Sequence, residues 1–439
     1  ITTIGSLGEI YQLQALYEKA EPLLLESLEL SKKVLGPEHP KTAMAFTQLG
    51  SLYVDQALYN KAESHYLKAL KIEEKVYGEN SYLLADRLND LGVLYLDKGL
   101  LKKSETFLLR ALSILDESPD SNNPSLEVTL YNLGSVNFNL GISIKAEKYF
   151  LRAIEITENN LGNEHPDISR SLQFLGMIYM DQGLYDKAEP LLVRSLAINE
   201  KTLGPTHPDT SDSLDRLASL YQDQGLYDKA EPLFIRALAI DEKVYEADHP
   251  SISTKLNNLA LLYMDQGLYD KAEPLLVRSL SISEKYFGSE NTQTATNLNN
   301  LGLLYLEKGF YKKAKPLLVK ALDIDEKNYG TFHPLVSIAS SNLALLYEDQ
   351  SIYDEGEPFA RKTLKINFTL IQRDAPYLVL SERQLFSESF GNTYERAFSY
   401  AWHGEKGKKL ALFSRLNKQG LLEEIEKRQA KLSMLPGPQ

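Results

Sequence analysis

The sequence contains no cysteine among its 439 residues, so disulfide bonds, thiolate metal sites and a cysteine nucleophile are excluded within this chain. Basic residues are in the minority, because 48 Lys and Arg stand against 60 Asp and Glu, and the formal net charge is −12. Contact with nucleic-acid phosphates needs an excess of Lys and Arg. The composition therefore argues against nucleic-acid binding and favours a neutral or basic partner.

Long apolar runs are lacking too. No stretch approaches the roughly 18 apolar residues of a membrane-spanning helix, and residues 1–5 show neither a Met nor a secretory signal. We interpret Ile1 as a cut boundary, and we expect a soluble cytoplasmic protein without membrane contact. Metalloprotease, phosphate-loop, dinucleotide-binding and nucleophile-elbow motifs are also missing. We therefore expect no enzymatic activity and no cofactor.

The feature that dominates the sequence is an internal repeat. Residues 183–190, Gly-Leu-Tyr-Asp-Lys-Ala-Glu-Pro, recur unchanged at 225–232 and 267–274, a spacing of 42 residues. The period yields nine units without insertions and two columns of small residues, which predict two close helix contacts per unit. One column comprises Ala20, Ala62, Ser104, Ala146, Ala188, Ala230, Ala272, Ala314 and Gly356. The other comprises Gly8, Gly50, Gly92, Gly134, Gly176, Ala218, Ala260, Gly302 and Ala344.

Each unit has the pattern of a helical hairpin. Apolar residues between 256 and 263 recur at i, i+3, i+4 and i+7, and a matching stripe covers 275–280. Gly267 predicts the end of the first helix, and Pro274 is expected in the first turn of the second. Because one hairpin cannot bury both of its faces, neighbouring hairpins must stack.

A His-Pro pair precedes five of the first helices, at His39, His165, His207, His249 and His333. Equivalent positions of adjacent units are two helices apart, farther than the roughly 8–10 Å between packed helices. These histidines therefore cannot share a metal ion, and we expect them to cap the helices that follow.

The pattern of small residues and tyrosines resembles the tetratricopeptide repeat. The 42-residue period and the segment 256–263, Leu-Asn-Asn-Leu-Ala-Leu-Leu-Tyr, resemble the repeats of kinesin light chains and their bacterial relatives. The resemblance implies an all-α, right-handed α-α superhelix of nine 42-residue hairpins over residues 1–370, with capping or linker helices over 371–439. It also implies a concave groove lined by the first helix of each hairpin. A motor-adaptor role is not implied, because no long heptad coiled coil precedes the repeats.

The helix face opposite the apolar stripe is expected to be exposed in this groove. One of its columns contains Gln48, Asp90, Asn132, Phe174, Arg216, Asn258, Asn300 and Asn342. An Asn amide offers a donor and an acceptor to a peptide backbone, and in the resembling families asparagines here hold extended peptides. The candidate peptide-binding residues in this column are thus Asn132, Asn258, Asn300 and Asn342. Arg216 is a further candidate, and it indicates that this part of the groove prefers a different ligand residue. Alternatively, the asparagines bond to neighbouring helices or water.

A second column on this side is acidic and contains Asp55, Asp97, Asn139, Asp181, Asp223, Asp265, Glu307 and Asp349. The candidate peptide-binding residues in this column are Asp223 and Asp265, and the acidic column predicts a basic peptide as the partner. The alternative is that each residue only solvates the end of its helix, although the helix dipole disfavours an acidic residue there.

The C-terminal segments 381–384 and 417–424 resemble the stretch that joins bacterial repeat arrays to a caspase-like CHAT domain. Three hypotheses for function follow. The first is a scaffold that binds a protein or an extended peptide in the groove. The second is the regulatory or substrate-recruiting arm of a CHAT protease-like effector, and the third is a purely architectural, self-associating module. A monomer is favoured.

Overall fold

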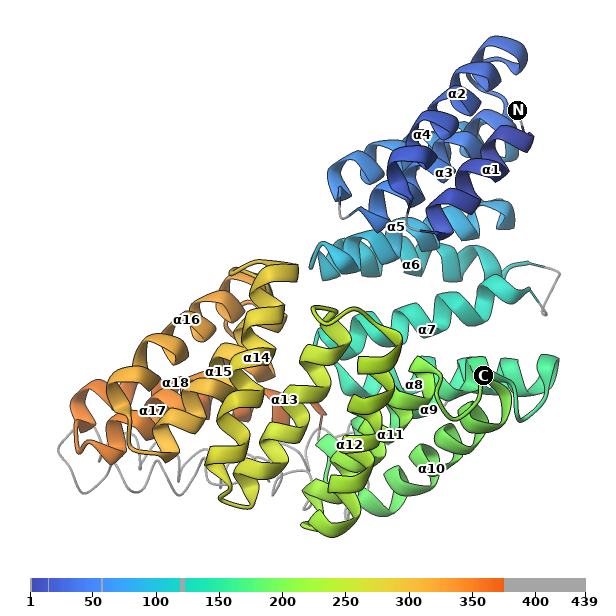
Figure 1. Cartoon of the computed structure of the whole chain (residues 1–439). Coiled ribbons are helices and arrows are strands. Elements are labelled where there is room, and N and C mark those ends of the chain that lie inside the picture. Colours follow the sequence, from blue (N-terminus) through green and yellow to red (C-terminus); the bar gives the residue numbers. More distant parts are fainter. Residues whose placement is uncertain (1, 15, 57, 119–122, 375–439) are drawn as a thin grey trace, which may run out of the picture. The chain divides into compact units, whose positions relative to one another are not determined.

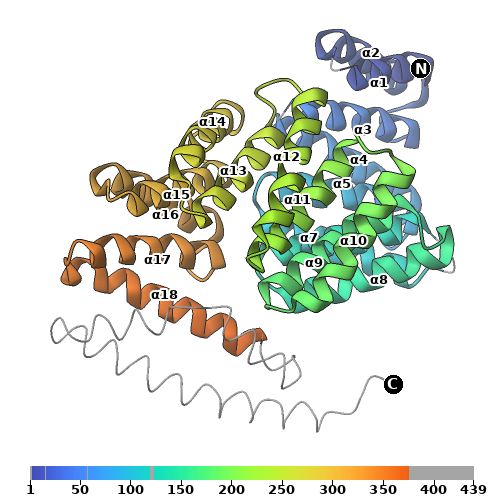
Figure 2. The same cartoon turned by 60° about the horizontal axis from the view of Figure 1, so that its bottom comes forward.

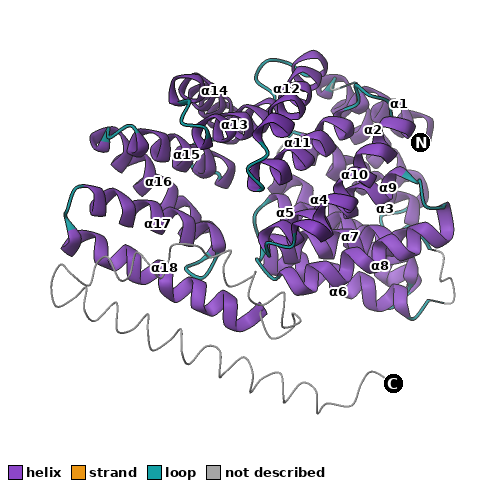
Figure 3. Cartoon of the chain, turned by 90° about the horizontal axis from the view of Figure 1, so that it is seen from below, coloured by secondary structure: helices purple, strands orange, loops and turns teal. Residues whose placement is uncertain are grey.

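Every regular element in the described part of the chain is a helix, and no strand occurs there (Figures 1 and 3). The computed structural model describes residues 2–14, 16–56, 58–118 and 123–374. The helices follow one another as antiparallel pairs, and hairpins pack against the next one within residues 2–163 and within residues 164–374. The predicted all-α array of helical hairpins is confirmed.

The helix boundaries repeat with the period of the sequence. The first helices within the described residues are α1 (Thr2–Leu13), α3 (Pro40–Asp55), α5 (Ala85–Asp97, after the short 3-10 helix η1, Tyr82–Leu84), α7 (Pro124–Asn139), α9 (Pro166–Asp181), α11 (Pro208–Asp223), α13 (Pro250–Asp265), α15 (Thr292–Glu307) and α17 (Pro334–Asp349). The second helices are α2 (Tyr17–Leu35), α4 (Tyr59–Tyr77), α6 (Leu101–Asp116), α8 (Ser143–Leu161), α10 (Tyr185–Thr202), α12 (Tyr227–Val244), α14 (Tyr269–Phe287), α16 (Tyr311–Tyr329) and α18 (Tyr353–Asp374).

The internal contacts group the helices into two units. Helices α1–α8 belong to the first, residues 1–163, and α9–α18 belong to the second, which begins at residue 164. In the second unit, α13–α14, α15–α16 and α17–α18 form successive hairpins (Figure 2). The division between residues 1–370 and 371–439 remains a prediction.

The small column that begins at Gly8 lets the two helices of a hairpin pack closely. A Cβ atom at Gly92 would lie 2.5 Å from the Leu108 side chain, and one at Gly134 would lie 2.6 Å from the Phe150 ring. Both contacts are shorter than van der Waals distance, so glycine permits the present spacing of these pairs. The partner side chain, sixteen residues later, fills the space that the missing Cβ leaves.

The turn between the two helices agrees with the prediction from glycine. Gly267 has φ 71°, a left-handed conformation that glycine adopts without strain. The Leu268 N–H donates to the Tyr263 carbonyl at 2.7 Å, and the Gly267 N–H donates to the Met264 carbonyl at 2.8 Å. These bonds satisfy carbonyls at the end of α13 and terminate the helix.

The expected position of Pro274 is wrong. Because α14 begins at Tyr269, directly after the tight turn, Pro274 is its sixth residue and lies in the second turn. The missing N–H leaves the Asp270 carbonyl without its helical donor. Pro274 and Asp270 are both exposed, so water can take the place of that donor.

The five histidines of the His-Pro pairs are confirmed as caps. In each pair the His Nδ1 accepts a hydrogen bond from the backbone N–H two residues later, and the proline is the first helical residue. His249 accepts from the Ser251 N–H at 3.2 Å, and its ring stacks on Tyr245 with centroids 3.8 Å apart. Asn123 and Asn291 cap α7 and α15 in the same way.

Replacing His249 with Ala is expected to lower the free energy of unfolding by about 1 kcal/mol, because the cap is lost. His249→Asn is expected to retain most of it, since Asn caps α7 and α15. Burial lowers the pKa of His249. The folded state therefore favours the neutral imidazole. The contribution of His249 to the free energy of unfolding is complete above the ordinary His pKa of about 6.5 and falls as the pH drops below that value. Urea unfolding at pH 7.5 and 5.5 measures both effects, and equal destabilisation by Asn and Ala would contradict the cap.

Candidate functional site

Two rows of mostly polar residues run along the first helices of the second unit, and each takes one residue from every repeat. The first contains Phe174, Arg216, Asn258, Asn300 and Asn342, and the second contains Asp181, Asp223, Asp265, Glu307 and Asp349. The second row is called the acidic row below. Each of its members is the last residue of its first helix.

The asparagines form a hydrogen-bonded chain with the residues that precede them in the sequence. From α17 to α11, Asn342 Nδ2 donates to Asn299 Oδ1 (3.1 Å), Asn299 Nδ2 to Asn300 Oδ1 (3.3 Å), Asn300 Nδ2 to Asn257 Oδ1 (3.0 Å), Asn257 Nδ2 to Asn258 Oδ1 (3.5 Å) and Asn258 Nδ2 to Asp215 Oδ2 (2.8 Å). This amide chain connects four first helices. Every donor points towards the Asp215 carboxylate, so the bonds polarise one another in the same direction.

The expectation that the whole asparagine column is exposed is therefore wrong. Asn300 and Asn132 are each only 8% exposed, and Asn258 and Asn342 are half-buried. The physical reason is that first helices of successive repeats also touch each other, so part of the face opposite the apolar stripe lies against a neighbouring helix. The amide groups of Asn258, Asn300 and Asn342 therefore form hydrogen bonds with the neighbouring helix and are only partly accessible to solvent. Their role in binding a peptide remains a prediction.

The residues that sequence reasoning missed are Asp215, Asn257 and Asn299, one position before the chosen column. They supply the acceptors that link successive repeats. The available signal was the Asn-Asn pair at 257–258, repeated at 299–300. Two adjacent amides on one helix can donate to and accept from both neighbours, which a single amide row cannot do.

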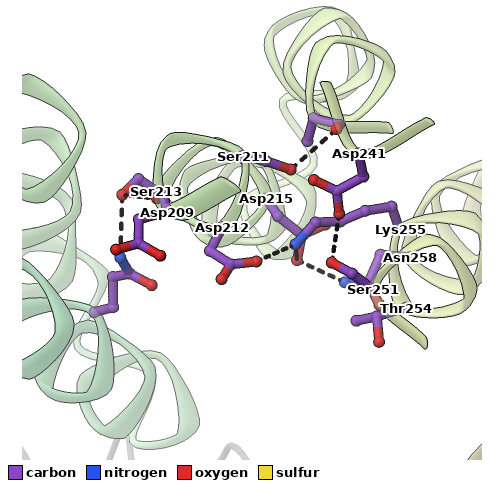
Figure 4. A network of polar contacts seen from close by, with 12 residues as sticks. Asp209, Ser211, Asp212, Ser213, Asp215, Asp241, Ser251, Thr254, Lys255 and Asn258 are labelled. Carbon is purple, nitrogen blue, oxygen red and sulfur yellow. Dashed lines mark hydrogen bonds and ion pairs between the residues drawn. The ribbon is translucent and has the colours of Figure 1, made fainter. Parts of the chain in front are cut away.

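A buried ion pair holds the acceptor end of the amide chain (Figure 4). Lys255 is 3% exposed and Asp215 is 1% exposed. The Lys255 Nζ lies 2.6 Å from Asp212 Oδ1 and 3.8 Å from Asp215 Oδ2. Burial lowers the pKa of Lys255, but the charges of Asp215 and Asp212 outweigh it and raise that pKa overall. The ammonium therefore stays charged between α11 and α13, and removing Lys255 would leave Asp215 as a buried carboxylate without its cation.

Arg216 differs from the asparagines of its row. Its side chain is half-buried and makes no ion pair within the part of the chain that the structure describes. Its positive charge lowers the pKa values of Asp181 and Asp215, although burial outweighs it in both and the pKa of each is raised. The first-helix face of this unit thus combines one partly accessible cation with the carboxylates of the acidic row.

The acidic row is exposed along its whole length, from Asp181 to Asp349. The Gln222 Nε2 donates to Asp265 Oδ2 at 2.6 Å across one repeat. Partial burial, followed by the charge of Asp265, raises the pKa of Asp223 to about 6, and partial burial and the charge of Asp223 raise the pKa of Asp181. A helix C-terminus disfavours negative charge. The stability of the helix ends therefore does not explain the row.

In the first unit the same columns are arranged differently. Asn89 Nδ2 donates to Thr129 Oγ1 at 2.8 Å, and Asp90 pairs with Arg87 on its own helix, α5. Asp55 and Asp97 are exposed at the ends of α3 and α5. Burial raises the pKa of Asp97 to about 6. Two of its first helices, α3 and α5, thus share the acidic ends of the second unit, but the polar packing differs.

Among the described residues, no group of three or more His, Asp or Glu side chains is arranged to hold a metal ion. No helix among them is long and apolar enough to span a membrane.

The fold and the repeated contacts define the class of all-α proteins built from tandem helical hairpins. Tetratricopeptide repeat models match residues 1–75, 45–117, 172–243, 212–254, 251–327 and 293–367, and a further tetratricopeptide repeat model matches 128–167. The chain belongs to the tetratricopeptide repeat family. A comparison with curated protein sequences gives no significant match.

Several solved structures share the fold. The Rap protein complexed with Competence and Sporulation Factor is 16% identical, with a TM-score of 0.58, 88% of this chain covered and 100% of that chain. The apo form of RapI is 19% identical, with a TM-score of 0.51, 65% of this chain covered and 98% of that chain. A putative kinesin light chain from Podosopora anserina with nearly identical TPR-like repeats is 28% identical, with a TM-score of 0.37, 47% of this chain covered and 98% of that chain.

The segments 381–384 and 417–424, which carry the resemblance to CHAT-linked proteins, lie outside the described residues. The role as an arm of a protease-like effector remains a prediction.

Asn300→Ala is expected to lower the free energy of unfolding by about 1–3 kcal/mol, because Asn257 Oδ1 and Asn299 Nδ2 both lose their buried partner. Asn342→Ala is the matched control. It removes only the donor at the half-buried end of the amide chain, and we expect a loss of about 1 kcal/mol or less. Urea unfolding of the two variants measures the difference, and equal losses would show that the amide chain does not act as a connected unit.

Proposed function

We propose that the chain is a protein- or peptide-binding scaffold, and that the exposed first-helix face of the second unit binds an extended basic segment. The acidic row is the observation that carries the proposal. Its carboxylates are exposed, recur once per repeat and affect one another's ionisation from Asp181 to Asp265. Charged residues that oppose the local helix dipole and remain accessible favour a role in binding over a role in folding.

The spacing of the row indicates which ligand fits. Successive first helices touch each other in the structure, and packed helices lie roughly 8–10 Å apart. A peptide in the extended polyproline II conformation advances about 9 Å per turn of three residues, and every third side chain lies on the same face. A Lys or Arg at every third position would therefore meet successive carboxylates. Leu261, Leu303 and Leu345 on α13, α15 and α17 are half-buried and supply apolar contact area to the same face.

Arg216 and the asparagines refine the proposed ligand. An acidic group of the ligand would find a partner in Arg216 at the α11 position. Each chain amide uses one of its two N–H groups within the protein, so the half-buried Asn258 and Asn342 keep one N–H for a peptide carbonyl. The Rap protein, which shares the fold, was solved in complex with Competence and Sporulation Factor. That complex supports ligand binding as a use of this fold.

The test begins with selection of peptides from a random displayed library on the full chain, followed by fluorescence anisotropy of the best binders. We expect basic residues at every third position. A triple variant that neutralises the row carries Asp223→Asn, Asp265→Asn and Glu307→Gln. It is expected to bind the peptide about tenfold more weakly, because exposed charge pairs contribute up to about 1 kcal/mol each. The matched control is Asp228→Asn, Glu246→Gln and Asp323→Asn, which makes the same charge change at other exposed positions.

Equal effects of the two triple variants would contradict the proposal, because net charge alone would then account for binding. Circular dichroism of both variants checks that the helices are retained. Selection of peptides without basic residues would contradict the assignment of ligand class.

The pH dependence of binding is a separate prediction. With a pKa of about 6, Asp223 is mostly ionised at pH 7.5 and mostly protonated at pH 5. A cationic peptide binds the ionised form, so affinity is expected to fall as the pH drops through 6, and binding near pH 6, where the free carboxyl is partly protonated, is expected to release protons. Titrations at pH 7.5 and 5 measure the change. An Asp223→Asn variant with the same pH dependence would contradict the role of this carboxyl group.

A further inference from the structure

One position on the second helices points to a property of the fold that peptide binding does not explain. It repeats every 42 residues, and at Glu73, Asn199 and Asp241 its polar contacts reach the first helix of the next repeat. Its members are Ser31, Glu73, Leu115, Thr157, Asn199, Asp241, Ser283, Asp325 and Asn367. Three of them are carboxylic acids: Glu73 lies at a junction inside the first unit, and Asp241 and Asp325 lie at junctions inside the second.

Two of these acids face a basic residue fourteen positions later. Glu73 Oε2 lies 3.3 Å from Arg87 Nε, and both side chains are largely buried. Asp241 accepts a hydrogen bond from the Ser251 hydroxyl, and its charge helps to keep Lys255 ionised. At both junctions the equivalent residue of the following first helix, Arg87 or Lys255, thus supplies a cation.

Asp325 lacks these partners. Ala339 occupies the position of Arg87 and Lys255, and Leu335 occupies the position of Ser251. The Asp325 side chain is 4% exposed, and its Oδ1 is buried without a hydrogen bond. Among the described residues, none forms an ion pair with it.

No cation on the surrounding helices compensates the Asp325 charge. On α16 its titratable neighbour is Tyr329, whose ring stacks on the α17 cap His333 with centroids 4.1 Å apart. The only charged residue of α15 is Glu307, at the opposite end of that helix, and α17 carries only Glu348 and Asp349, also at its opposite end. Lys362 of α18 pairs with Glu326. The junction therefore buries a carboxyl group that has no ion pair among the described residues and an Oδ1 without a hydrogen bond.

We propose that the junction between α16 and the α17–α18 hairpin is a proton-controlled joint, in which protonated Asp325 keeps the hairpin packed and ionised Asp325 loosens it. A neutral carboxylic acid is tolerated in apolar surroundings, whereas an unpaired carboxylate there is strongly destabilised. When the hairpin detaches, water solvates the carboxylate and removes that penalty. The observations that support this joint do not depend on the proposed peptide binding.

The direction of the pH effect follows from the two states of the joint. Burial raises the pKa of Asp325 from 3.8 to about 7 in the packed state, and the detached state regains the ordinary value. The packed state therefore binds more protons between these values. Packing is strongest near pH 4, weakens as the pH rises towards 7, and changes no further above 7.

Loosening the joint would also affect the first-helix face. Asn342 of α17 is the first donor of the amide chain, and Asp349 of α17 belongs to the acidic row. Detachment of α17 breaks the bond to Asn299 and removes one repeat from that face. The number of repeats that present a continuous surface would thus depend on pH.

Hydrogen exchange followed by mass spectrometry on the full chain tests the joint at pH 5 and pH 7, after correction for the intrinsic exchange rates. In wild type, the opening equilibrium constant for peptides from α17 is expected to rise with pH, by at most tenfold for each pH unit. Peptides from α13 in the same samples are the internal reference. Asp325→Asn, which is nearly isosteric and uncharged, is expected to protect α17 equally at both pH values.

Two further variants sharpen the result. Ala339→Lys restores the cation found at the other junctions and is expected to reduce the pH dependence while the carboxylate is retained. Asp323→Asn, at an exposed position of α16, is expected to leave it unchanged. The proposal is overturned if wild type shows no pH dependence in α17, or if Asp325→Asn retains the wild-type dependence.

Discussion

The packing of each hairpin against the next is the interaction on which the rest of this structure depends. A single hairpin of 42 residues has two faces and no core of its own, so its apolar stripes are buried only by its neighbours. Small residues bring the helices close enough for that burial, and His caps with left-handed glycines set where each helix starts and stops. The proposed binding face exists because stacking places one first helix beside the next.

The buried polar residues between successive repeats differ from one repeat to the next, although the repeats are otherwise alike. Between α11 and α13 a buried lysine is held by two aspartates, whereas from α13 to α17 a chain of amides connects the helices. Buried ion pairs and amides contribute little net stability compared with apolar packing, but a missing partner is costly. This asymmetry explains why a junction whose acid has lost its cation is the natural place for a joint.

The repeat period, the hairpins, the His caps and the glycine turns could all be predicted from the sequence, since each depends on local residue chemistry. Pro274 was misplaced because the start of α14 is determined by a tight turn, which shifts the helix by a few residues relative to the proline. The exposure of Asn300 was misjudged because a helical wheel gives the face of a residue but not the distance to the next first helix. Nothing in the uninterrupted period marks the division of contacts near residue 163.

The central claim is that the acidic row binds ligand while the amide chain holds the repeats together. The most direct measurement places Asn300→Ala and the variant neutralised at Asp223, Asp265 and Glu307 in the same two assays, urea unfolding and binding of a selected basic peptide at pH 7.5. The account predicts that Asn300→Ala loses stability but retains affinity, and that the neutralised variant loses affinity but retains stability. The reverse result, with affinity lost in Asn300→Ala at unchanged stability, would contradict the account and identify the asparagines as the binding residues.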